Sequence, residues 1–78
     1  MDKFNDTFFA EKNIEEAVKD AINSLPKKCR KIFLLSRNEG LKYREISENL
    51  NISVNTVENQ MSIALKKLRI KLKDYISV

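Results

Sequence analysis

The 78-residue sequence predicts a small all-α domain of four helices. It contains one glycine and one proline, which leaves little for hairpin turns, and its β-branched residues do not form alternating runs. Apolar residues instead recur at spacings of three and four, the period of a helix that buries one face. A chain of this length allows one domain with a modest core. We expect residues 1–10 to be a tail or interdomain linker and residues 11–78 to form the domain.

The first predicted helix covers residues 11–24, and the second covers residues 27–38. Asn13, with Glu16 three residues later, resembles a capping box, although Thr7 offers an earlier start. The only proline suits the first turn of the second helix, and the only glycine follows its end. The inner faces are expected to contain Ile14, Ala17, Val18, Ala21, Ile22 and Leu25 in the first helix, and Cys29, Ile32, Phe33 and Leu35 in the second.

The stretch 42–61 predicts a helix-turn-helix, in which a helix at 43–50 is joined by a tight turn to a long helix at 54–76. Asn51 stands where the turn backbone is expected to be left-handed, a conformation that Asn tolerates better than most residues other than Gly. Ser53 is a suitable N-cap for the long helix. The apolar positions are Ile46, Leu50 and Ile52, followed by a stripe of Val57, Met61, Ala64, Leu68, Leu72 and Tyr75.

The net charge of +4 is unevenly distributed along the chain. Residues 1–24 contain three basic and six acidic side chains, a charge of −3, whereas residues 25–78 contain twelve basic and five acidic ones, a charge of +7. A basic half that also holds a helix-turn-helix predicts a polyanionic partner, and the motif favours this over a merely solubilising charge.

Catalysis and cofactor binding are not expected. The chain has no histidine, so no histidine triad or histidine metal site can form, and its single cysteine, Cys29, lies in a predicted core stripe without an adjacent base. A lone cysteine suits a reducing cytoplasm, and the sequence has no apolar run long enough for membrane insertion.

The start of the long helix contains the residues that we expect to read DNA. In a helix-turn-helix, the N-terminal half of the second helix enters the major groove. The side chains opposite the core stripe are Asn55, Thr56, Glu58, Asn59 and Ser62, with Ile63 beside them. Asn59 can form two hydrogen bonds with adenine, Glu58 can accept one from the cytosine amino group, and Ser62 or Thr56 can bond either kind of base. Ile63 can contact a thymine methyl group.

A second set of residues is expected to contact DNA phosphates. Lysine and arginine pair with phosphate, and the start of a helix attracts anions. The residues in this set are Lys42, Tyr43, Arg44, Ser53, Lys66 and Lys67.

Residues 25–69 resemble region 4 of bacterial extracytoplasmic-function (ECF) sigma factors, most closely those of the Bacteroidetes type. The resemblance rests on four elements that occur in the family's order, and the match across residues 25–69 has no gaps. These are Leu25-Pro26, Gly40 to Ile46, Ser53 to Val57, and Ala64 to Arg69.

This resemblance implies that the domain binds the −35 element of promoter DNA as part of RNA polymerase during transcription initiation. It also implies docking on the flap of the polymerase β subunit and binding by an anti-sigma factor. Two features depart from the family pattern. Glu58, Gln60 and Ile63 stand where many relatives have Lys or Arg. The chain also has no region 2, so we expect either an excised C-terminal domain or a protein made of region 4 alone.

Two other interpretations remain. The helix-turn-helix also resembles that of LuxR-type transcription regulators, which dimerise through the last helix. Alternatively, the domain is a region 4 mimic that binds polymerase or an anti-sigma factor without reading DNA.

Overall fold

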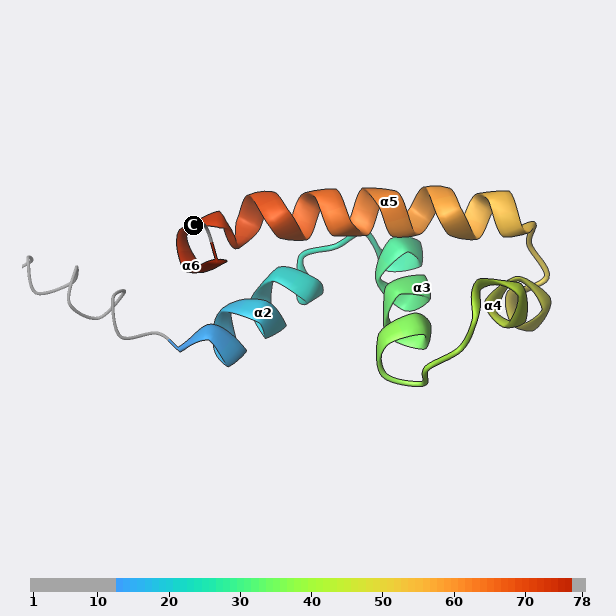
Figure 1. Ribbon diagram of the computed structural model, residues 1–78, viewed down its shortest axis with the longest axis horizontal. Coiled ribbons are helices and arrows are strands. Elements are labelled where there is room, and N and C mark those ends of the chain that lie inside the picture. The colour runs from blue at the N-terminus through green and yellow to red at the C-terminus, as the bar shows by residue number, and fades with distance from the viewer. Residues whose placement is uncertain (1–12, 77–78) are drawn as a thin grey trace, which may run out of the picture.

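The computed structural model describes residues 13–76, and these form helices with no strand among them. The helices are α2 (Ile14–Asn23), α3 (Lys27–Arg37), α4 (Tyr43–Leu50), α5 (Val54–Lys71) and α6 (Lys73–Ile76) (Figure 1). The predicted all-α fold is therefore confirmed. Thr7 and the tail expected at residues 1–10 lie outside the described residues. None of the described helices is long and apolar enough to cross a membrane.

Helix α2 begins as the capping pattern predicted. The side-chain oxygen of Asn13 accepts a hydrogen bond of 2.8 Å from the backbone amide of Glu16. Glu15 and Glu16 lie in the first turn, where negative charge stabilises the positive end of the helix dipole. The helix ends at Asn23, and the backbone amide of its C-cap residue, Ser24, bonds to the carbonyls of Asp20 and Ala21. Asn13 is thus the N-cap of this helix.

The predicted turn between α4 and α5 is confirmed in detail. Asn51 has φ 59° and ψ 47°, which is the left-handed conformation expected there. This allows the amide of Ile52 to bond back to the carbonyl of Ser47 at 3.0 Å, closing the end of α4. The hydroxyl of Ser53 then accepts a bond of 3.0 Å from the amide of Thr56, which caps the start of α5.

Helix α5 is the centre of the fold, and α2, α3 and α4 all pack against it along one side (Figure 1). The best-buried branched side chains are Ile32, Ile46 and Val57, one from each of α3, α4 and α5, with no exposed surface. Ser47 is also buried, and its hydroxyl donates a hydrogen bond of 2.7 Å to the carbonyl of Arg44, so this buried polar group is satisfied. Leu35, expected in the inner face of α3, is only half-buried.

The prediction of one continuous helix from 54 to 76 is wrong. Helix α5 ends at Lys71, Leu72 adopts φ −104° and ψ 10°, and the chain then turns toward α2 as the short helix α6 (Figure 1). Leu72 and Tyr75 line one hollow together with Ala17 and Ala21 of α2. The bend keeps Leu72 buried against α2 but leaves Tyr75, a predicted core residue, 41% exposed.

Candidate nucleic-acid interface

The outer face of α5 lies opposite the side that packs on α3 and α4. A helix turns by about 100° per residue, so Asn55 and Asn59 project away from the buried stripe, with Ser62 and Ile63 extending the same face by one turn. Asn55, Glu58, Asn59 and Ser62 are all exposed, as expected of base-reading side chains. Ile63 is 40% exposed on this face, a large apolar side chain that the core does not use.

Thr56 differs from the other predicted readers because it lies at the side of α5. Its side chain is half-buried, and its hydroxyl forms a hydrogen bond of 3.0 Å with the hydroxyl of Ser53. Ser53 also accepts the amide of Thr56, so both hydroxyl groups already have partners within the helix start. These two residues therefore contribute to the shape of the interface before any DNA is bound.

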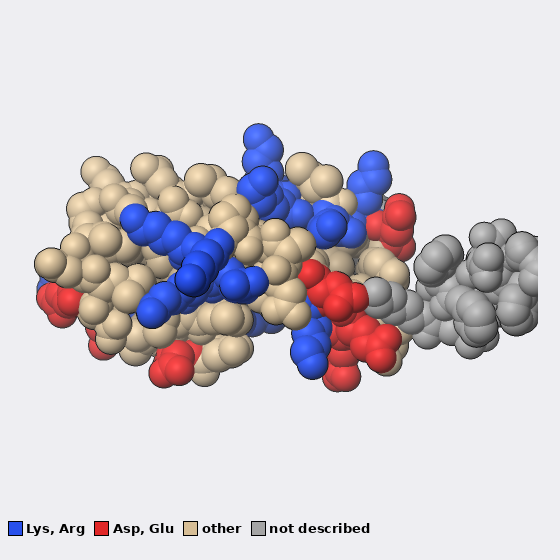
Figure 2. All heavy atoms as spheres, turned by 180° about the vertical axis from the view of Figure 1, so that it is seen from behind, with Lys and Arg blue, Asp and Glu red and all other residues tan. Residues whose placement is uncertain are grey.

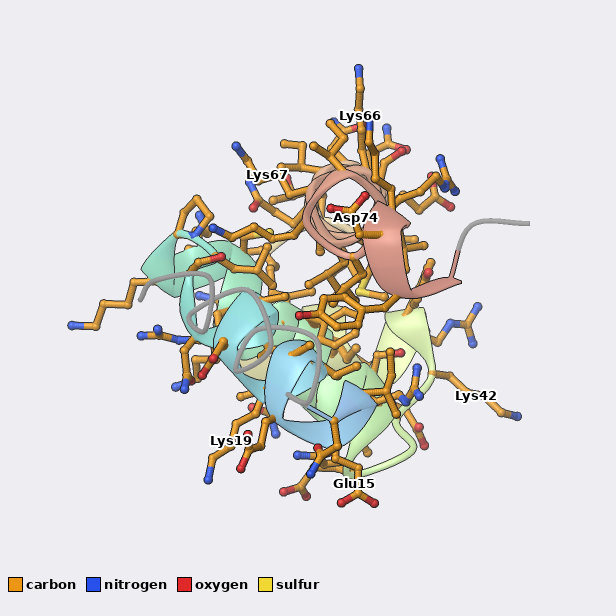
Figure 3. The ribbon with its side chains drawn as sticks, turned by 90° about the vertical axis from the view of Figure 1, so that its left-hand side faces the viewer. Glu15, Lys19, Lys42, Lys66, Lys67 and Asp74 are labelled. Atoms are coloured by element: carbon orange, nitrogen blue, oxygen red, sulfur yellow. The ribbon has the colours of Figure 1, made fainter. Side chains whose placement is uncertain are left out.

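The predicted phosphate contacts surround α5 rather than forming one patch. Figure 3 shows Lys66 pointing away from the helices, Lys67 pointing to one side of α5, and Lys42 pointing to the other side. Arg44 is exposed like these lysines, whereas Tyr43 is half-buried and packs against the core. The ring of Tyr43 thus has a structural role at the start of α4.

Charge is separated along the molecule. Figure 2 shows Lys and Arg side chains gathered over α3 and over the C-terminal half of α5, while Asp and Glu gather over α2. The N-terminal part of α5 is nearly neutral, because Glu58 is the only charged side chain between Val54 and Leu65. Attraction to a polyanion must therefore come from cations around the N-terminal part of α5 and not from that part itself.

Two features of the surface lie outside the residues predicted to contact DNA. The first is the group of cations at the start of α3, which comprises Lys27, Lys28, Arg30 and Lys31. The second is an apolar groove between α2, α3 and α5. The apolar groove is lined by Val18, Ile22, Phe33, Leu65, Leu68 and Leu72, with Arg37 and Asn38 beside them. Helical spacing indicates that these apolar residues face inward, but it does not indicate that the helices leave a gap between them.

Comparison with known proteins identifies the family. A family model described as sigma-70, region 4 matches residues 15–68, which extend from the first turn of α2 nearly to the end of α5. No curated protein and no solved structure matches the chain. The matched range includes the turn at Asn51, the cap at Ser53 and the whole outer face of α5 described above. The chain therefore belongs to the sigma-70 region 4 family, a family of DNA-binding regulatory domains of sigma factors.

Proposed function

We propose that this domain recognises the −35 element of bacterial promoters as part of an RNA polymerase holoenzyme, and that it comes from a sigma factor of the ECF type. The main support is the outer face of α5, where the amides of Asn55 and Asn59 and the hydroxyl of Ser62 are exposed on a helix that begins at a capped turn. Lys67 points to one side of α5, and Lys42, at the start of α4 below it, points to the opposite side of the molecule (Figure 3), so cations are available on both sides of the helix for phosphate contacts.

The chemistry of the outer face suits discrimination more than strong attraction. The amide of Asn59 can donate to and accept from the edge of adenine, and Glu58 can accept from the amino group of cytosine. Glu58 also repels phosphate, which disfavours duplexes that place no amino group opposite it. Because the N-terminal part of this face carries no cation, we expect the isolated domain to bind DNA weakly, and polymerase to hold it at the promoter.

This proposal is tested by selecting preferred duplexes from a randomised library with the domain and then titrating variants. Asn59→Ala should weaken binding to the selected duplex by about 1–3 kcal/mol and leave binding to a scrambled duplex nearly unchanged. Asn23→Ala, which removes an exposed asparagine at the end of α2, is the matched control and should change neither affinity. An equal loss on both duplexes for Asn59→Ala would contradict base reading.

The apolar groove is the proposed contact with the polymerase β flap. Its lining from three helices offers a concave apolar surface for a single amphipathic helix, a common mode of peptide recognition. Ile22→Glu should abolish binding to an isolated β-flap fragment while the DNA preference remains. Ile14→Glu changes an exposed isoleucine of the same helix outside the groove and should preserve flap binding. If both variants bind the flap as the parent does, the contact lies elsewhere. An anti-sigma factor would compete for the same groove.

One observation favours the alternative of a free-standing LuxR-type regulator. Ile70, on the outer side of α5, is 64% exposed, and an apolar residue in this place would suit pairing of two copies of the helix. That alternative requires a dimer that dissociates on dilution. Sedimentation across a concentration series distinguishes it, since the sigma-factor interpretation expects a monomer throughout.

A further inference from the structure

The start of α3 has an unusual charge arrangement. Among the described helices, α3 alone has basic residues and no acidic residue in its first turn, which contains Lys27 and Lys28. By contrast, α2 begins with Glu15 and Glu16. Cations near the positive end of the helix dipole are destabilising, and no acidic side chain occurs anywhere between residues 25 and 38. The fold therefore retains these charges at a cost to its stability.

The lysines of this group do not belong to the buried core. Arg30 is half-buried and donates a hydrogen bond of 2.9 Å to the carbonyl of Asn23, which joins the start of α3 to the end of α2. Lys27, Lys28 and Lys31 are all exposed. Local features that oppose stability without a structural return are expected at functional surfaces.

The position of these lysines relative to α5 is fixed by the neighbouring cysteine. The thiol of Cys29 donates a hydrogen bond of 3.4 Å to the carbonyl of Gln60, so the first turn of α3 lies against the side of α5. Lys67 lies on the same side of α5, two turns after Gln60, and its charge acts on the Cys29 thiol. Lys67 points away from the side occupied by Lys42 (Figure 3). Lys27, Lys28, Lys31 and Lys67 therefore form one basic surface, which we call the α3–Lys67 surface.

We propose that the α3–Lys67 surface binds the phosphodiester backbone of duplex DNA outside the element that α5 reads, on the side of α5 opposite Lys42. The inference rests on the proposed function and deepens it, because it extends the footprint beyond the bases. Exposed lysines act on phosphate as point charges and need no particular base sequence. The surface adjoins the side of α5, and Figure 2 shows basic side chains gathered over α3 and over the C-terminal half of α5.

The test compares Lys27→Gln/Lys28→Gln with Lys19→Gln/Lys73→Gln, a control that removes the same charge from exposed lysines outside this surface. Each protein is titrated at several salt concentrations with a selected duplex, a scrambled duplex of equal length, and the selected element without its flanks. The α3 variant should lose roughly tenfold in affinity for both long duplexes at low salt, and the slope of log K against log salt should fall by about two. On the trimmed duplex it should match the parent.

A stability measurement separates this role from a structural one. Because the substituted lysines oppose the helix dipole, the α3 variant should unfold at a higher temperature than the parent while it binds DNA less well. A loss equal to that of the control, a loss confined to the selected duplex, or the same loss on the trimmed duplex would each overturn the proposal. If the parent shows no sequence preference, the proposed function fails, whereas the dependence on duplex length still tests the surface.

Discussion

The two ends of α5 are packed in different ways. Its N-terminal half packs on α3 and α4 through Ile32, Ile46 and Val57, which leave no surface exposed. Its C-terminal half packs on α2, whose buried contacts come from the small side chains of Ala17 and Ala21.

This difference indicates that the ends of the helix serve different purposes. The N-terminal end is a closed core, and because interiors of this kind are close-packed, it fixes the angle at which the outer face of α5 meets a partner. At the other end, Val18 and Ile22 stay half-buried and Leu65 is 45% exposed, so apolar surface remains available. In the proposed holoenzyme, the N-terminal end of α5 reads promoter DNA, and the apolar groove at the C-terminal end contacts the polymerase β flap. We expect α2 to detach from α5 at a lower free energy than α3 or α4 does.

The largest expected effect on the free energy of unfolding comes from replacing an isoleucine by alanine in the helices that pack on the two ends of α5. Ile46→Ala should lower the free energy of unfolding by about 2–5 kcal/mol, since it removes a fully buried side chain from the closed end. Ile22→Ala should cost less than about 1 kcal/mol, since that side chain is only half-buried. Urea denaturation followed by circular dichroism measures both. Equal losses would show that the two ends are packed alike.

A smaller effect on stability is expected at the turn between α4 and α5, which sets the angle between these two helices. Asn51→Ala should cost about 1–2 kcal/mol, because alanine is strained in the left-handed conformation, whereas Asn51→Gly should be nearly neutral. Asn49→Ala makes the same chemical change on an exposed position within α4 and should be slightly stabilising. Thermal melts of the three variants measure these differences. If Asn51→Ala is as harmless as Asn49→Ala, the turn does not impose the conformation described here.

The closed end could be predicted from the sequence because its determinants are local. Asn51 and Ser53 specify a turn and a cap through bonds to residues a few positions away, and the spacing of Ile46, Leu50 and Val57 specifies which faces meet. The exposed positions of Asn55, Asn59 and Ser62 follow from the same helical period. Their contacts with bases remain a prediction.

The C-terminal end of α5 and its packing on α2 could not be predicted in this way. The bend at Leu72 has no glycine or proline to mark it, and it depends on the position of α2, which is distant in sequence. The apolar groove likewise exists because three helices leave a gap, and no single helix pattern contains that information. The unusual charge at the start of α3 is visible in the sequence, since Lys27 and Lys28 oppose the helix dipole. That these lysines lie beside α5 is visible only in the structure.

The smallest expected effect is a pH dependence at the closed end. Burial raises the pKa of the Cys29 thiol above its usual value, and the charge of Lys67 only partly opposes this. The folded domain therefore keeps the thiol proton to a higher pH than the unfolded chain, in which a cysteine ionises at about pH 8.5. The contribution to stability is complete below the pKa of the unfolded chain and is lost as pH rises through the folded pKa.

Cys29→Ala isolates the contribution of the thiol to the pH dependence of stability, because the other titrating groups are common to both proteins and cancel in the comparison. The variant should be less stable at pH 7 owing to the small cavity that it creates. Between about pH 8 and 10, however, its free energy of unfolding should fall less steeply than that of the parent. Urea denaturation at several pH values measures the two slopes. Parallel curves would mean that water reaches the thiol, and the N-terminal half of α5 would then be no more closed than the half that faces α2.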